Sequence, residues 1–380
     1  MDGKKVKVVE NNEHLGQIVS GISQEDKNVN SRLTKGRKSL FGLLGAGFSY
    51  KCFLSPVLKL HIYRTYTCPI TRSGLSTFAL RTAQIEPLAL FQRKTLKAIL
   101  KLSITAPTPA IHFLTGELPI EGKIHKDIFS LFFSVWSNPG TKIYDILIYL
   151  LKNSSENSHT WAIHLRHLCK KYGLEDPLSC LGRDPPDRAD YKEHITTRIT
   201  AYYENLLRHQ ASENSCMSYL NVATLGLRGR HHPALSGMVT TREVKLSRAH
   251  IKLLAGNYLT YKTKADQSGG SPRCRICMTG EDETVSHVIS TCLALKHQRD
   301  KILEEFETLC KLTKNNINFE HIMKNEDKLC QFILDPSSLN LSNRVSLQDP
   351  LLPQFFRLLR DFCFIIDKTR IELLKRLEHS

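Results

Sequence analysis

Four side chains in the last third of the sequence have types and spacing that suit a metal ion. Cys274 and Cys277 enclose two residues, His287 follows after nine more, and Cys292 after a further four. A cysteine pair at this distance fits one tight turn with both sulfurs directed at one point, and the other two ligands can complete a tetrahedron. Three thiolates and one imidazole suit Zn²⁺, and four protein ligands leave no open position. The sequence therefore predicts a structural zinc site.

The segment that carries these ligands is too short to bury a core of its own. Residues 280–283 are Gly, Glu, Asp and Glu, and we expect them to form a solvated, hairpin-like turn between the two ligand pairs. In isolated zinc peptides metal binding supplies roughly 10–16 kcal/mol of folding free energy at neutral pH. A RING-type cross-brace would need eight ligands, whereas this spacing supplies four.

Other groups of chemically active residues are weaker candidates. His164, His167 and Cys169 fall within one expected helix, where packing and surface roles are the simpler interpretation. The pair His231 and His232 is interpreted as part of a basic loop rather than as a metal site.

An enzymatic active site is not visible in the sequence. The Tyr/Phe-x-Asp-Asp pattern of a two-metal polymerase does not occur, and neither does a glycine-rich phosphate loop. Asp187, Asp190 and Lys192 come nearest to a nuclease pattern, but a nuclease needs its acids on neighbouring strands and two intervening residues are too few. We interpret this stretch as a loop and a helix cap. No small-molecule substrate is indicated.

Positive charge is concentrated in two segments. The chain has 53 Lys and Arg against 37 Asp and Glu, yet residues 31–101 hold thirteen cations and one acid, and residues 227–264 hold eight cations and one acid. Solvated surfaces normally mix both signs, so these segments predict a polyanionic partner. The expected phosphate contacts are Arg32, Lys35, Arg37, Lys38, Arg93, Lys94, Lys97 and Lys101. A second, weaker candidate surface is Arg228, Arg230, Lys245, Arg248 and Lys252.

The partner is expected to be RNA or DNA rather than a membrane. The longest strongly apolar stretch, residues 128–136, is far shorter than the 20 or so residues of a spanning helix. The polar start of the chain does not resemble a signal peptide. Eleven cysteines, an odd number, do not suggest a secreted disulfide scaffold. We expect an intracellular protein of the nucleus or the cytoplasm, or both.

The periodicity of apolar residues predicts a mainly α-helical fold with a short β-hairpin at the N-terminus. The hairpin is expected within residues 5–20 with a turn or a bulge at Gly16. Residues 265–272 should be a flexible lead into the cysteine pair. Helices are expected over residues 31–46, 55–68, 87–102, 122–152 with a break at 137–140, 190–210, 296–312, and from Pro353 to about 377.

The order of these motifs is similar to that in one known family. Residues 13–19 resemble the strand turn that ends a polymerase palm, and residues 32–45 and 54–69 resemble thumb helices. Residues 91–97 and 107–119 resemble the segments that follow. Residues 248–256 with the Cys3His motif, and then 360–363, resemble a zinc-binding region and a C-terminal helix. The chain thus resembles the C-terminal portion of a non-LTR (LINE-like) retrotransposon reverse transcriptase protein.

The resemblance implies a division of the chain and a role for it. The implied segments are a palm-end remnant (1–30), a basic thumb-like helical domain (31–104), a helical connector (105–226), a zinc-binding region (227–312) and a C-terminal helical segment (313–380). The family's activity is RNA-directed DNA polymerisation, but the fingers, most of the palm and the catalytic aspartates have no counterpart here. What the resemblance carries over is binding of RNA or DNA through the phosphate backbone, without catalysis.

Two alternatives stay open at this point. The chain is one piece of an active RNA-directed DNA polymerase whose palm lies upstream of Met1, or it is a zinc-stabilised protein-interaction domain reused by a host. The first predicts primer extension, and the second predicts a protein partner that survives high salt.

Overall fold

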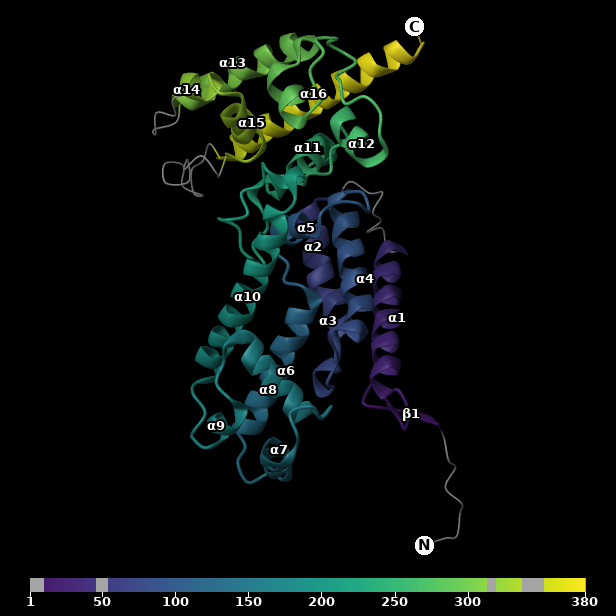
Figure 1. The fold of residues 1–380 in the computed structure, drawn as a ribbon, viewed down its shortest axis with the longest axis vertical. Coiled ribbons are helices and arrows are strands. Elements are labelled where there is room, and N and C mark those ends of the chain that lie inside the picture. Colours follow the sequence, from purple (N-terminus) through teal and green to yellow (C-terminus); the bar gives the residue numbers. More distant parts are fainter. Residues whose placement is uncertain (1–9, 46–53, 313–318, 337–351, 380) are drawn as a thin grey trace. The chain divides into compact units, whose positions relative to one another are not determined.

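The protein is mainly helical in the residues that the computed structural model describes, which are 10–45, 54–312, 319–336 and 352–379 (Figure 1). Over these ranges sixteen α-helices accompany one two-stranded antiparallel sheet. The predicted fold class, a mainly α protein with a short N-terminal hairpin, is confirmed. No helix within the described ranges is long and apolar enough to cross a membrane.

The helices and strands of the described residues follow one another in a fixed order along the chain. They are β1 (Asn11–His14), β2 (Gln17–Ser20), α1 (Gln24–Gly45), α2 (Pro56–Ile62), α3 (Cys68–Arg72), α4 (Thr82–Leu100), α5 (Thr108–Thr115), α6 (Ile120–Trp136), α7 (Lys142–Asn153), α8 (Trp161–Tyr172), α9 (Pro177–Leu181), α10 (Arg188–Ser212), α11 (Thr241–Leu254), α12 (Tyr261–Ser268), α13 (Lys296–Leu312), α14 (Phe319–Met323), α15 (Glu326–Leu334) and α16 (Leu352–His379). The described residues also include single π-turns (Tyr63–Thr67, His287–Thr291) and short 3₁₀ turns (Leu75–Thr77, Ser215–Met217, Pro233–Leu235, Leu293–Leu295).

The described residues form two compact units, and each is assembled from segments that are not consecutive. The first unit draws on Met1–Ser49, His61–Lys94 and Leu118–Asn205, and the second on Tyr50–Leu60, Thr95–Glu117 and Leu206–Ser380. The five segments implied by the family resemblance are consecutive along the chain, unlike these two units, and that division stays a prediction.

The hairpin of the first unit turns at Leu15 and Gly16, with positive φ angles of 48° and 78°. Positive φ at both central residues is the geometry of a two-residue hairpin turn, and glycine adopts it without steric cost. The predicted turn at Gly16 is confirmed. The first strand is Asn11–His14, and its pairing with the second joins Asn11 to Ser20 and His14 to Gln17. The valines at positions 6, 8 and 9, expected in that strand, lie outside the described residues.

Helices α1, α6 and α8 supply much of the first unit's core. Leu33 of α1, Ile124 and Phe129 of α6, and Leu165 of α8 are almost completely buried. In α6 the buried positions recur every three or four residues, so one side of the helix faces the core and the other faces solvent.

The second unit is centred on α16, which packs against α11 and α13. Phe306 of α13, Phe332 of α15 and Phe362 of α16 meet edge to face with ring centroids 5.7 and 6.5 Å from Phe306. All three side chains are fully buried. The apolar stretch of α16 around Phe362 therefore packs in the core.

Several expected boundaries need correction. The first basic helix begins at Gln24 rather than at residue 31, and α4 spans Thr82–Leu100 rather than 87–102. Residues 261–268, partly expected as flexible, form α12, which Thr260 caps by accepting a hydrogen bond from the Thr263 amide. The break near residue 138 and the helix over 296–312 are confirmed.

Candidate metal centre and basic surfaces

The first two ligands lie in a tight reversal of the chain. The Cys274 amide donates to the Glu281 carbonyl at 2.8 Å, and the Glu283 amide donates to the Pro272 carbonyl at 2.8 Å. These bonds bring the two ends of the reversal together as a short antiparallel bridge between Arg273 and Asp282. The backbone can reverse so sharply because Met278 and Gly280 adopt positive φ angles of 54° and 85°.

The other two ligands flank a single π-turn. The Cys292 amide donates to the His287 carbonyl at 2.8 Å, five residues back, which closes the turn. The His287 amide donates to the Thr284 hydroxyl at 3.0 Å and so fixes where the turn begins. The turn therefore directs the side chains of His287 and Cys292 toward the cysteine pair.

The four side chains form one cluster that can hold a metal ion. One ligand atom from each of Cys274, Cys277, His287 and Cys292 lies within 4.8 Å of all the others. Cys277 Sγ is 3.4 Å from His287 Nε2. Cys277 is partly exposed, whereas the other three residues are buried. Within the described residues this is the one group of three or more potential ligands that converges in this way.

The thiols differ in their acidity. Burial raises the pKa of Cys274, and it raises that of Cys292 to about 12. Partial burial also acts to raise the pKa of Cys277. Hydrogen bonds to this thiol outweigh the effect of burial and lower the pKa to about 7, and the largest contribution comes from the Thr279 hydroxyl. Buried thiols that resist ionisation in the free protein become stable thiolates only when a cation compensates their charge. The donor set therefore fits a metal.

The histidine is oriented by groups outside the cluster. Glu281 Oε2 lies 2.8 Å from His287 Nδ1, and the Thr291 hydroxyl lies 3.2 Å from the same nitrogen. If Nδ1 donates its proton to the carboxylate, the lone pair of Nε2 is directed at the cysteines. This carboxylate–histidine arrangement is typical of metal-binding imidazoles. Glu281, expected to be merely a solvated loop acid, therefore acts on a ligand.

Glu283 corrects the expectation of a fully solvated loop. Its side chain is completely buried and accepts two hydrogen bonds from Arg370 of α16, at 2.9 and 2.7 Å. It also accepts a 2.7 Å bond from the Tyr261 amide. A buried carboxylate needs such partners, because an isolated one would not stay ionised. The cysteine turn, α12 and α16 are thus joined at one carboxylate.

The basic residues predicted on α1 do not all have the same surroundings. Arg37 and Lys38 are exposed. Arg32 is buried and donates a 2.6 Å hydrogen bond to the Gly16 carbonyl, so its guanidinium supports the hairpin. Lys35 forms a 2.8 Å ion pair with Glu13 and lowers the pKa of that exposed carboxyl. Arg37 and Lys38 are therefore the more accessible members of this group.

The basic residues predicted on α4 also differ in their surroundings. Lys94 is exposed, whereas Arg93 forms a 2.5 Å ion pair with Glu86. Lys97 donates to the Ile104 carbonyl at 2.6 Å. Lys101 lies just beyond the helix with a φ of 59°, so the expected continuous face through residue 101 is wrong.

The second basic group lies in a loop and on α11. The backbone of Arg230 packs closely on Gly116: a Cβ atom at position 116 would lie only 2.2 Å from the Arg230 carbonyl oxygen. The side chains of Arg228 and Arg230 are nevertheless exposed. On α11, Lys245, Arg248 and Lys252 share one face, because they are three and four residues apart. Lys245 and Lys252 are exposed and Arg248 is half-buried, while the opposite side of the helix packs on α16.

The weaker candidates have structural roles. His232, expected in a basic loop, is buried and lies 3.5 Å from the buried Asp335 carboxylate. His164 is half-buried, and burial lowers its pKa to about 4. Asp187 accepts hydrogen bonds from the Ala189 and Asp190 amides at 2.7 and 3.3 Å, which confirms the predicted helix cap.

Comparison of the chain with protein-family models, with curated proteins and with solved structures gives no match.

Proposed function

We propose that the Cys3His cluster binds one structural Zn²⁺ ion. Three observations support this: all four donors come from the protein, three of them are buried, and Glu281 orients the imidazole. Thiolate and imidazole donors favour zinc over Mg²⁺ or Ca²⁺, and a complete protein ligand set leaves no position for substrate. A bound ion would cross-link the cysteine turn to the π-turn and stabilise both.

The test is metal analysis of the purified chain. We expect about one zinc per chain, with a fully coordinated site that resists exchange by Mg²⁺. Substitution by Co²⁺ should give the absorption of a tetrahedral thiolate site. An octahedral spectrum, or no bound metal, would contradict this assignment.

We propose further that the chain binds RNA or DNA, without catalysis, through its phosphate backbone. The observation that carries this proposal is the segregation of charge: residues 31–101 hold thirteen cations and one acid. The exposure of Arg37, Lys38 and Lys94 supports it, because these side chains are available to phosphates. Backbone contacts by Lys and Arg give affinity with little sequence preference.

The order of motifs along the chain favours a retroelement origin. We propose that the chain corresponds to the thumb and zinc-binding portions of a non-LTR reverse transcriptase protein, with the basic helices α1 and α4 preceding the Cys3His cluster. The sequence lacks the paired aspartates of the polymerase, so the proposed role is to hold nucleic acid rather than to extend it.

A pair of charge-neutralised variants tests the nucleic-acid proposal. In the first, Arg37, Lys38 and Lys94 become Gln. In the control, three exposed lysines of α13, Lys296, Lys301 and Lys311, become Gln; they lie in the segment 271–380, where cations and acids balance at sixteen each. Both variants lose the same net charge. We expect the first alone to lose affinity for duplex and single-stranded oligonucleotides. Equal losses of affinity in the two variants would show that binding does not depend on the surface formed by Arg37, Lys38 and Lys94.

A second candidate function, protein interaction, is favoured by α7. Ile143, Ile146 and Tyr149 are 65%, 56% and 65% exposed and recur every three residues along this helix. Contiguous apolar surface of this kind is typical of interaction sites. A protein partner that stays bound at high salt, and is released by Ile146→Glu, would support this function.

A further inference from the structure

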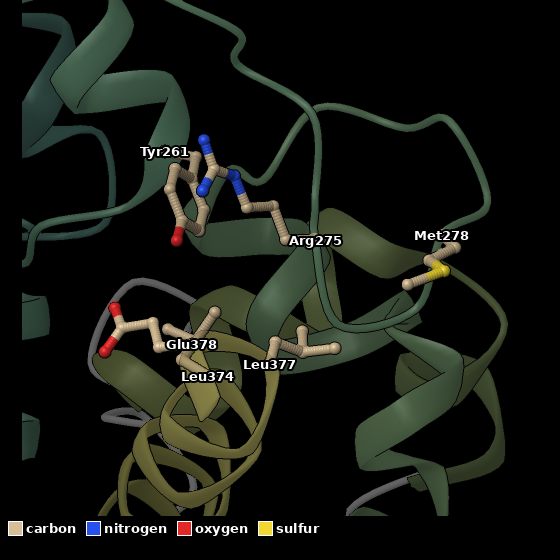
Figure 2. Close-up of a pocket in the computed structure, with 6 residues that line it drawn as sticks. All are labelled: Tyr261, Arg275, Met278, Leu374, Leu377 and Glu378. Atoms are coloured by element: carbon tan, nitrogen blue, oxygen red, sulfur yellow. The ribbon is translucent and has the colours of Figure 1, made fainter. Parts of the chain in front are cut away.

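An open pocket of about 350 Å³ lies between the cysteine turn and the end of α16 (Figure 2). It is lined by Tyr261, Arg275, Met278, Leu374, Leu377 and Glu378. These residues come from α12, from the turn that carries Cys274 and Cys277, and from α16. The volume is at the lower end of the range for small-molecule sites, roughly 300–1,000 Å³, and so suits one planar group.

One wall of the pocket is a stack of planar side chains. The Arg275 guanidinium carbon lies 4.8 Å from the centroid of the Tyr261 ring, and Figure 2 shows the two side chains next to each other. Lys264 Nζ lies 5.2 Å from the same centroid. The backbone positions of both residues in the stack are fixed. The Tyr261 amide donates a hydrogen bond to Glu283, and Arg275 directly follows Cys274 of the Cys3His cluster. Aromatic rings and guanidinium planes are the surfaces on which unpaired bases stack.

The opposite side of the pocket is apolar. Leu374 and Leu377 are three residues apart on α16 and therefore share a face, and Leu377 is 40% exposed. Met278, from the cysteine turn, is 76% exposed. An unbranched thioether adapts its shape to a flat ligand. A planar, partly apolar group between the stack and these side chains would remove apolar surface from water.

The cations of the segment 261–279 favour a ligand that carries negative charge. Residues 261–279 contain four cations, Lys262, Lys264, Arg273 and Arg275, and a single acid, Asp266. Lys262 is close to Asp266 and Asp282, at 3.5 and 3.6 Å, whereas Lys264, Arg273 and Arg275 are exposed. A ligand that combines a planar apolar group with flanking negative charges is a nucleotide whose base is unpaired. Bases within a duplex are stacked and cannot enter such a pocket.

We propose that this pocket accepts one unstacked base of a single-stranded nucleic acid. The base stacks on the Arg275 guanidinium, which the Tyr261 ring supports, and a flanking phosphate lies near Lys264. Glu378 presents only hydrogen-bond acceptors when ionised, so it favours bases that carry an amino group. The inference rests on the proposed nucleic-acid binding and adds a single-strand site to it.

The experiment compares single-stranded and duplex oligonucleotides of one sequence, as both RNA and DNA, by fluorescence anisotropy. We expect Tyr261→Ala to weaken single-strand binding by about tenfold or more and to leave duplex binding unchanged. Tyr261→Phe retains the ring and should bind like the wild type. Arg275→Lys retains the charge at an exposed position but lacks the plane, so it should also weaken single-strand binding. Lys301→Ala, at an exposed position of α13 outside the pocket, is the control and should bind like the wild type.

The outcomes separate this site from the proposed function. If the wild type binds nucleic acid but Tyr261→Ala and Arg275→Lys bind single strands equally well, the pocket is not a base site and the broader proposal stands. If the wild type binds no nucleic acid, both proposals are overturned. The wild type should prefer oligo(C) over oligo(U), and Glu378→Leu, which removes the acceptors, should abolish that preference. No preference in the wild type, or a preference that persists in the variant, would remove Glu378 from the site.

Discussion

Glu283 and Arg370, 87 residues apart in sequence, form a buried ion pair with two hydrogen bonds. Glu283 is fully buried and Arg370 is 7% exposed at its side chain. Burial acts to lower the pKa of Arg370, but its hydrogen bonds to Glu283 outweigh this and raise the pKa. The pair connects the loop within the Cys3His cluster to the long C-terminal helix, so the stability of the cysteine turn depends on α16.

Removing one member of this pair should be costly. Glu283→Gln leaves a buried guanidinium without its counter-charge, and we expect the free energy of unfolding to fall by about 3–5 kcal/mol. Glu307→Gln is the control, because Glu307 pairs with Lys311 at 2.7 Å on an exposed surface, where a pair contributes about 1 kcal/mol or less. Urea denaturation of both variants measures the difference. Similar losses in the two would show that the buried pair does not join these elements.

Loss of two ligands should remove the metal. Cys274→Ser combined with Cys277→Ser leaves one thiol and one imidazole, which cannot retain zinc against dilution. We expect metal content near zero and increased proteolysis around residues 274–292. Cys216→Ser, at an exposed cysteine outside the cluster, is the matched control and should keep its metal. A double variant that retained stoichiometric zinc would exclude the proposed site.

The Glu281 carboxylate, which orients His287, should strengthen metal binding. Glu281→Gln weakens the hydrogen bond to His287 Nδ1, and substitutions of such partners typically lower metal affinity about 10- to 100-fold. Asp282→Asn is the control, because the Asp282 carboxylate lies near Lys262 instead. Competition with a chromophoric chelator gives both affinities. Equal affinities would mean that Glu281 does not orient the ligand.

A buried histidine should make the fold sensitive to acid. His250 of α11 is fully buried, with Nε2 2.8 Å from the Leu334 carbonyl, and its pKa is lowered to about 4. Burial is the main cause; the Leu334 carbonyl and Asp335 act to raise the pKa, while His232 and Arg360 act to lower it. The unfolded chain takes up the proton near pH 6.5, so folded stability is lost as pH falls from there to about 4, by about 3 kcal/mol.

Comparison of two histidine variants isolates this effect. His250→Gln cannot take up a proton, so its free energy of unfolding should fall less between pH 7 and pH 5 than that of the wild type. His209→Gln, at a side chain that is 74% exposed, should leave the pH dependence unchanged. Identical pH dependence in wild type and His250→Gln would show that this residue is not the source.

Much of the fold follows from local sequence signals. The helix over 296–312, the break near residue 138 and the Gly16 turn were predictable, because periodic apolar residues, proline and glycine act over a few positions. The cysteine and histidine spacing likewise identified all four members of the cluster. Boundaries without such signals, such as the start of α1 at Gln24, were missed.

Features that depend on distant contacts could not be predicted. Nothing near Glu283 in the sequence indicates that Arg370 will neutralise it, so an acid in a short loop was interpreted as solvated. Arg32 resembles any surface cation until the hairpin turn places the Gly16 carbonyl beside it. His232 similarly meets Asp335 only in the folded unit. Each case is a polar group whose burial depends on a partner far away in the chain.

The central claim, binding of nucleic acid through phosphate contacts, is tested most directly by the salt dependence of affinity. For six or more neutralised phosphates, the dissociation constant should rise about a thousandfold or more between 50 and 200 mM salt. The variant lacking Arg37, Lys38 and Lys94 should show a shallower slope, by about one unit per lost contact. Affinity that does not change with salt, or the same slope in both proteins, would contradict the account.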